Sequence, residues 1–150
     1  MTECLFYEIR GRALEKVLAD LLEKSLQRGW RVLVRAGSKE RVLDLNAKLW
    51  TYKDDSFLPH GCFKDGDAAE QPVYLEEPDE DAGNPNGAEV LVLAEGGTAS
   101  DWNNYQRCIT LLDGFDDEQI EQAKTWRESL AAEGVDAVWW RQGDKGWEKD

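Results

Sequence analysis

Apolar residues along this chain fall into two alternating patterns. Short continuous apolar runs, typical of strands buried on both faces of a sheet, occupy residues 4–9, 31–35, 72–75, 90–94, 108–112 and 135–140. Apolar side chains three and four residues apart, which predict amphipathic helices, occupy residues 13–28, 38–50 and 116–133. Helix caps are expected at Ser38 and Asp116, and helix stops at Gly29 and Gly134.

Strands and helices in this order predict an α/β fold with a mostly parallel central sheet and helices on both faces. No repeat or linker divides the chain, so residues 1–150 are expected to form a single domain. Two long polar connections interrupt the pattern. Residues 51–71 form one, and the acidic stretch 76–89, rich in turn formers, is expected to be a surface loop. A helical turn is expected to start near Ser100.

The charge balance limits the partners of the chain. A formal net charge of −13 disfavours independent binding to DNA or RNA, where Lys and Arg neutralise phosphates. Direct binding of DNA by aromatic stacking is therefore the least favoured function. The start of the chain lacks the features of a signal peptide, and every apolar run is far shorter than the roughly 20 residues of a membrane span. We expect a cytoplasmic protein with no membrane contact.

The cysteines indicate reduced thiols. Cys4, Cys62 and Cys108 are odd in number and widely spaced, which suits neither a disulfide framework nor a zinc site with close cysteine pairs. A zinc site would need all three thiols and His60, the one histidine of the chain. We expect Cys4 and Cys108 to lie in buried strands, and we predict no metal and no cofactor.

Signatures of catalysis are mostly missing. The sequence has no GxxxxGK[ST] phosphate loop, no GxGxxG after the first strand and no GxSxG nucleophile elbow. Asp113, Asp116 and Asp117 follow a buried strand, and carboxylates at such a place could hold Mg²⁺ for a hydrolase. Helix capping by Asp116 explains the same residues, so a magnesium-dependent hydrolase is the alternative function and a non-catalytic protein the preferred one.

One loop and one helix carry an unusual combination of rings and cations. The stretch LWTYKDDSFLPHG at residues 49–61 brings several large rings into a region that otherwise reads as a loop. Those rings either join the core or line a pocket. On the last helix, Lys124 and Arg127 lie beside the apolar face, where snorkelling of their stems or an open pocket edge would explain them. Rings and cations together would suit a peptide that ends in an aromatic residue and a carboxylate.

Several motifs resemble the chi subunit of bacterial DNA polymerase III over nearly the whole chain. They are the strand LFYEI, the strand GWRVLV, the helix end LNAKLW, the loop SFLPH, and a last helix ending in AAEG before a tryptophan-bearing strand. The resemblance implies a Rossmann-like three-layer fold without nucleotide-binding chemistry. It also implies a non-catalytic accessory subunit of the clamp-loader assembly in DNA replication, contacting DNA only indirectly.

Partners and site residues follow from the same resemblance. Chi subunits bind the acidic, phenylalanine-terminated tail of single-stranded DNA-binding protein, and in many bacteria also the psi subunit. The tail-binding residues of the family fall on Trp50 and Phe57, with Lys124 and Arg127 as the cations, and an aromatic–basic pair of the family matches Trp126 and Arg127.

Overall fold

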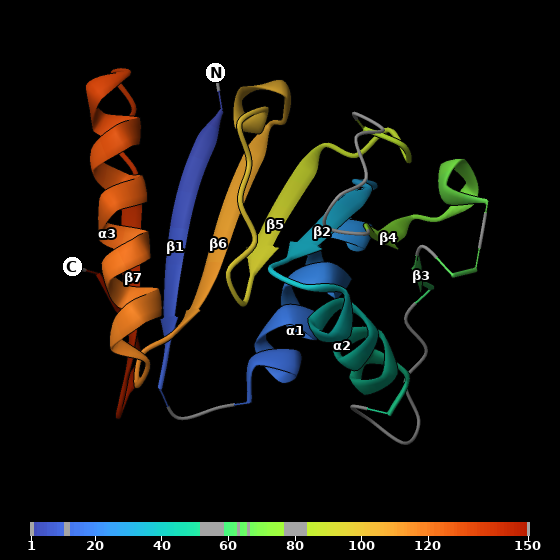
Figure 1. Ribbon diagram of the computed structural model, residues 1–150, viewed down its shortest axis with the longest axis horizontal. Helices are drawn as coiled ribbons and strands as arrows, with labels where there is room; N and C mark the ends of the chain where they lie inside the picture. The colour runs from blue at the N-terminus through green and yellow to red at the C-terminus, as the bar shows by residue number, and fades with distance from the viewer. Residues whose placement is uncertain are drawn as a thin grey trace.

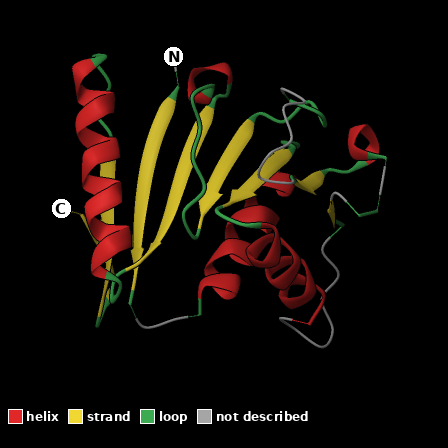
Figure 2. Ribbon diagram, viewed as in Figure 1, coloured by secondary structure: helices red, strands yellow, loops and turns green. Residues whose placement is uncertain are grey.

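The computed structural model describes residues 2–10, 13–51, 59–62, 64–65, 67–76 and 84–149. Within them the helices are α1 (Leu14–Gln27), α2 (Lys39–Thr51) and α3 (Asp117–Ala132). The strands are β1 (Glu3–Ile9), β2 (Val32–Ala36), β3 (Gly61–Cys62), β4 (Val73–Leu75), β5 (Val90–Ala94), β6 (Arg107–Asp113), β7 (Val138–Gly143) and β8 (Gly146–Lys149). Two short 3₁₀ turns are η1 (Ala68–Glu70) and η2 (Trp102–Asn104). Figure 2 shows the three helices around one twisted sheet.

The described strands form one sheet in the order β3-β4-β2-β5-β6-β1-β7-β8. Every neighbouring pair is parallel except β7 and β8, which form an antiparallel hairpin at one edge. The first strand therefore lies inside the sheet, between β6 and β7 (Figure 1). The mostly parallel α/β architecture expected from the sequence is confirmed.

Alternate strand residues face two separate cores. On β2, Val32 and Val34 belong to the core beneath α1 and α2, whereas Leu33 belongs to the core on the other side. The second core includes Ala123 and Leu130 of α3 and two rings from the β5–β6 connection. Helices α1 and α2 therefore cover one face, while α3 and residues 95–106 cover the other. Figure 1 shows α3 along β7 and the pair α1–α2 near β2.

The helix boundaries follow the predicted caps. The Ser38 hydroxyl accepts from the backbone N–H of Arg41, and the Asp116 carboxylate accepts from those of Glu118 and Gln119. Helix α3 ends in a left-handed Gly134 with φ of 85°, after which the Val135 N–H donates to the Leu130 carbonyl at 2.9 Å. This hydrogen bond defines a Schellman C-cap, and the same arrangement at Gly29 ends α1.

The strand predicted at residues 135–140 is shifted. Val135 belongs to the C-cap of α3 and packs on the second core, so β7 begins three residues later, at Val138. Strands β3 and β8 were not predicted, because a two-residue strand shows no alternation and GWEK reads as a polar tail. In the predicted acidic loop 76–89, Glu76 is buried beside β4, while residues 77–83 lie outside the described part of the chain.

The predicted burial of two thiols is confirmed. Cys4 and Cys108 are register partners on the neighbouring strands β1 and β6, and both are almost fully buried. Burial raises the pKa of the Cys4 thiol to about 11 and that of the Cys108 thiol further still. Neither group forms a reactive thiolate near neutral pH. No helix among the described residues is long and apolar enough to cross a bilayer.

Candidate functional site

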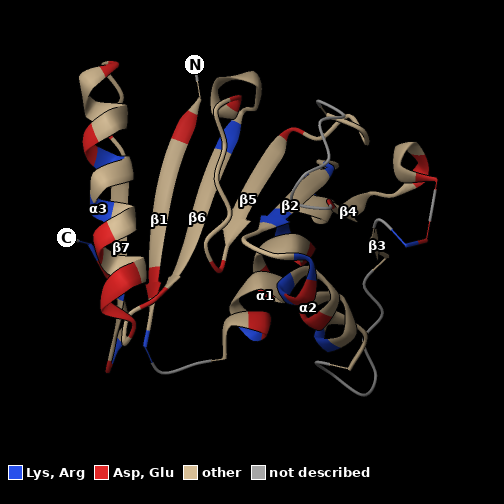
Figure 3. Cartoon of the chain, viewed as in Figure 1, with Lys and Arg blue, Asp and Glu red and all other residues tan. Residues whose placement is uncertain are grey.

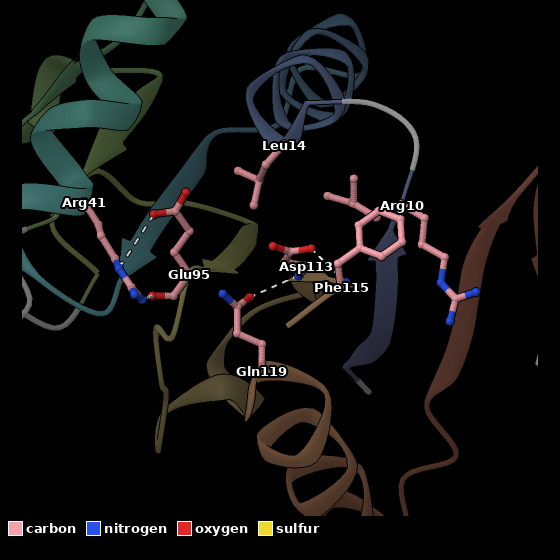
Figure 4. Close-up of a pocket in the computed structure, with 8 residues that line it drawn as sticks. Arg10, Leu14, Arg41, Glu95, Asp113, Phe115 and Gln119 are labelled. Carbon is pink, nitrogen blue, oxygen red and sulfur yellow. Dashed lines mark hydrogen bonds and ion pairs between the residues drawn. The ribbon is translucent and has the colours of Figure 1, made fainter. Parts of the chain in front are cut away.

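A small cavity lies where the chain reverses its direction of winding. Strands β1 and β6 are neighbours, but α1 follows β1 onto one face and α3 follows β6 onto the other. Ligands of open α/β sheets bind in the crevice that such a reversal creates at the carboxyl ends of the strands. The cavity has a volume of about 260 Å³ and is lined by Ile9, Arg10, Leu14, Arg41, Glu95, Asp113, Phe115 and Gln119 (Figure 4).

The carboxylates at this edge are engaged in local structure. Asp113 accepts from the Phe115 N–H at 2.9 Å, and its own N–H donates to the Gln119 side chain at 3.0 Å (Figure 4). Asp116 is the N-cap of α3. No three His, Cys, Asp or Glu side chains within the described residues form a group that could hold a metal ion. A magnesium-dependent hydrolase based on Asp113, Asp116 and Asp117 is therefore not favoured.

The opposite wall of the cavity contains a strained residue. Glu95 has a left-handed φ of 46°, and its carbonyl accepts from the backbone N–H of Gly37 at 3.2 Å and from Arg41. A Cβ on Gly37 would come within 2.7 Å of that carbonyl oxygen, so glycine is required there. Burial raises the pKa of Glu95, and the nearby Arg41 partly opposes this shift. The contacts of Arg41 with Glu95 hold the turn after β5 in place. The cavity is lined by both acidic and basic side chains.

The two halves of the LW…SFLPH motif meet in space. Trp50, at the end of α2, is half exposed, and its ring lies 4.3 Å from the ring of His60, centroid to centroid. His60 is buried, with Nε2 3.4 Å from the carbonyl of Asn46 one turn earlier on α2. The motif therefore forms one local unit that presents the indole of Trp50 to solvent. Phe57, the second predicted aromatic contact, lies outside the described residues.

The predicted residues of α3 point in different directions. The Lys124 side chain is mostly exposed, and its Nζ lies 3.8 Å from Glu121. The Arg127 guanidinium lies 5.6 Å from the centre of the Trp139 ring on β7, on one flank of the helix. Trp126 lies on the other flank, where its ring meets that of Trp102 edge to face at 6.4 Å.

The predicted site residues fall on opposite faces of the sheet. Trp50 belongs to α2, which packs on the first core, whereas Lys124, Trp126 and Arg127 belong to α3, which packs on the second. The structure brings Trp50 to His60 and Arg127 to Trp139, but it does not bring Trp50 to the α3 cations. Helical periodicity predicted where each side chain lies around its own helix. It could not predict which face of the sheet that helix covers.

A second and larger hollow on the described surface was not predicted. It is a groove of about 1210 Å³ between α3 and residues 96–100, with Leu93, Thr110 and Leu112 at its base. Gln122, Trp126 and Ser129 line it from α3. The one signal in the sequence was the small-residue run GGTAS, because small side chains in a connection that crosses a sheet leave its face partly uncovered.

A buried charge network holds that connection in place. Arg35 of β2 donates from Nε to Glu76 at 2.7 Å and from Nη1 and Nη2 to the two carboxylate oxygens of Asp101 at 2.7 and 3.0 Å. Burial works against the charge of Arg35, but the hydrogen bonds to Asp101 and Glu76 outweigh it, so the Arg35 pKa is raised. Tyr105 donates to Asp101, and burial raises the Tyr105 pKa to about 12.

Comparison with known proteins identifies the family. A family model described as DNA polymerase III chi subunit, HolC, matches residues 1–137. A protein of Rickettsia prowazekii (strain Madrid E) named probable DNA polymerase III subunit chi is 30% identical over 93 residues. That alignment covers 62% of this chain and 54% of the relative, so the chain spans about half the length of the relative it matches. The chain thus belongs to the DNA polymerase III chi subunit family.

Proposed function

We propose that this protein is a non-catalytic accessory subunit of the replicative polymerase that binds the acidic C-terminal tail of single-stranded DNA-binding protein. The observation that carries the proposal is the Trp50–His60 unit, in which the family motif presents a half-exposed indole at the surface. Among the described residues, Trp50 is one of two large apolar side chains that are exposed; the other is Phe115.

In this proposal the terminal phenyl ring of the tail packs on Trp50 and on Phe57. Burying one such ring is worth about 2–3 kcal/mol before entropic losses. A shallow site of this size binds with an affinity on the order of micromolar, or about −8 kcal/mol. The tail thereby links single-stranded DNA-binding protein to the polymerase assembly, directly or through a psi subunit at the clamp loader.

The α3 cations Lys124 and Arg127 are proposed as a separate contact of the tail, whereas Trp126 lines the groove on the other flank of the helix and is not included in that contact. Two cations suit an acidic ligand, and arginine can pair with a carboxylate through two hydrogen bonds. Because these residues lie across the sheet from Trp50, the two groups must be tested independently.

The test is a fluorescence anisotropy titration of a labelled peptide with the sequence of the acidic tail. Trp50→Ala should raise the Kd about tenfold or more, since the indole is the main apolar contact. Arg127→Ala should do the same if α3 contacts the tail, and the effect of Arg127→Ala should weaken as salt concentration rises because it is electrostatic. Circular dichroism before each titration verifies the fold.

Two matched controls make the result specific. Phe115→Ala is the control for Trp50→Ala, because it removes the other exposed ring. Arg28→Ala is the control for Arg127→Ala, because the Arg28 guanidinium lies 4.8 Å from the centre of the Trp30 ring, as that of Arg127 lies near the Trp139 ring. Neither should change the Kd by more than about twofold. An unchanged Kd in folded Trp50→Ala would refute the Trp50 site, and an unchanged Kd in Arg127→Ala alone would refute only the α3 contact.

A further inference from the structure

The groove between α3 and residues 96–100 has the chemistry of a protein-binding surface. Its accessible lining is mostly apolar, and its volume of about 1210 Å³ exceeds the space that one or two side chains would fill. Trp126 lies in one wall and is braced edge to face by Trp102, so its ring has a fixed orientation. A large, rigid aromatic ring in a hollow is the typical anchor of an interface.

The rim of the groove has one sign of charge. Asp117, Glu118 and Glu121 line it from the first turns of α3, and no Lys or Arg is among its described lining residues. Figure 3 shows acidic positions, in red, at the beginning of α3. Lys124 and Arg127 lie on other sides of the helix and do not line the groove.

We propose that this groove binds a basic amphipathic segment of another protein. Apolar side chains of that segment pack on Trp126 and the base of the groove, while its Lys and Arg side chains meet the three carboxylates of the rim. A hollow lined by α3 residues from Asp117 to Ser129 suits an amphipathic helix with anchors three and four residues apart.

Charge excludes the other occupants. A second copy of this chain carries the same net charge of −13 and would bring one acidic rim against another. An acidic tail or a nucleic acid backbone would meet the same repulsion. The groove therefore serves a partner different from the ligand proposed at Trp50, and the inference does not depend on that site.

The test uses two designed helical peptides of about 18 residues with leucines three and four residues apart, one carrying Lys and the other Glu at the remaining positions. In anisotropy titrations the Leu/Lys peptide should bind the full chain and the Leu/Glu peptide should not. Trp126→Ala should weaken binding about tenfold. Thr98→Trp places a large ring in the exposed wall opposite α3 and narrows the groove. It should weaken peptide binding to a similar extent, although the sequence of α3 is unchanged.

Charge reversal on α3 locates the contact. Glu121→Lys should raise the Kd at least about fivefold, since it replaces an attraction at the rim by a repulsion. Glu40→Lys makes the same change of net charge on α2, which covers the other face of the sheet, so it should change the Kd by less than about twofold. Trp50→Ala, on the other face, should leave the Leu/Lys peptide bound whatever its effect on the acidic tail.

Equal weakening by Glu121→Lys and Glu40→Lys would overturn the proposal, because it would indicate general attraction to an acidic protein. So would equal affinity for the Leu/Glu peptide, or displacement of the Leu/Lys peptide by the acidic tail. A dimer detected by light scattering and dissociated by Thr98→Trp would instead assign the groove to a second copy of the chain.

Discussion

Arg35→Met tests whether the buried charge network stabilises the fold. The substitution keeps most of the side-chain volume but removes the ion pair to Glu76, whose side chain is 1% exposed, and the double hydrogen bond to Asp101, which is 27% exposed. Removing one partner of a buried ion pair costs about 3–5 kcal/mol, because a charge stays behind in a low dielectric. Water reaches Asp101, so we expect a loss of about 3 kcal/mol.

The measurement is urea-induced unfolding at pH 7, followed by far-ultraviolet circular dichroism. A loss of about 3 kcal/mol lies within the usual 5–15 kcal/mol stability of a domain, so the variant should remain folded without urea. Arg35→Lys keeps the charge but not the planar fork, and its loss should be intermediate.

Lys48→Met is the control for this experiment. Its ion pair with Asp44 joins adjacent turns of α2, and both side chains are about half exposed. Such pairs contribute about 0.5 kcal/mol or less. If Arg35→Met lost less than about 1 kcal/mol, or no more than Lys48→Met, the buried network would not stabilise the fold more than an exposed ion pair does.

Two further predictions concern proton binding and thiol chemistry. Hydrogen bonds from Arg35 lower the pKa of the Asp101 carboxyl in the folded chain. The stability that the ionised Asp101 contributes is therefore complete above the ordinary carboxyl pKa of about 3.9. It is lost as the pH falls through the lower pKa that Asp101 has in the folded chain. Urea unfolding of Asp101→Asn at several pH values should accordingly show a smaller loss of stability below about pH 4 than the parent chain; an identical acid dependence would contradict this. Cys4, Cys62 and Cys108 are free and buried, so an aromatic disulfide reagent at pH 8 should label the folded chain at least about a hundredfold more slowly than the urea-unfolded chain. Rapid labelling of one thiol in the folded chain would show that its burial is not maintained in solution.

The sequence predicted the elements whose patterns are long and regular. Buried strands such as Val90–Ala94 and helices capped by Ser38 and Asp116 occur where expected. The boundary of β7 failed because a Gly followed by Val can begin a strand or complete a Schellman cap, and only the hydrogen bond from Val135 to Leu130 distinguishes them. Strand β8 is stabilised by its partner β7, not by its own sequence.

The candidate site was less accessible to sequence reasoning. Periodicity placed Arg127 near the buried side of its helix, and the structure adds the ring of Trp139 beneath it. The contact of Trp50 with His60 joins two motif segments that the sequence could only place in order. The α3 groove lies between the β5–β6 connection and a helix that comes later in the chain. The spacing of these two segments follows from the order of the strands in the sheet, which the sequence pattern does not show.

The internal position of β1 has a consequence for synthesis. Leu5 pairs with Ile109 on one side and with Val138 on the other, so both neighbours of β1 are translated long after it. Contacts so distant in sequence fold slowly. Until β6 and β7 leave the ribosome, both edges of the apolar run CLFYEI remain available for pairing with another nascent chain. This protein therefore pairs its first strand only after most of the chain has been translated, and a chain released before Arg107 would retain an open β-strand that favours aggregation.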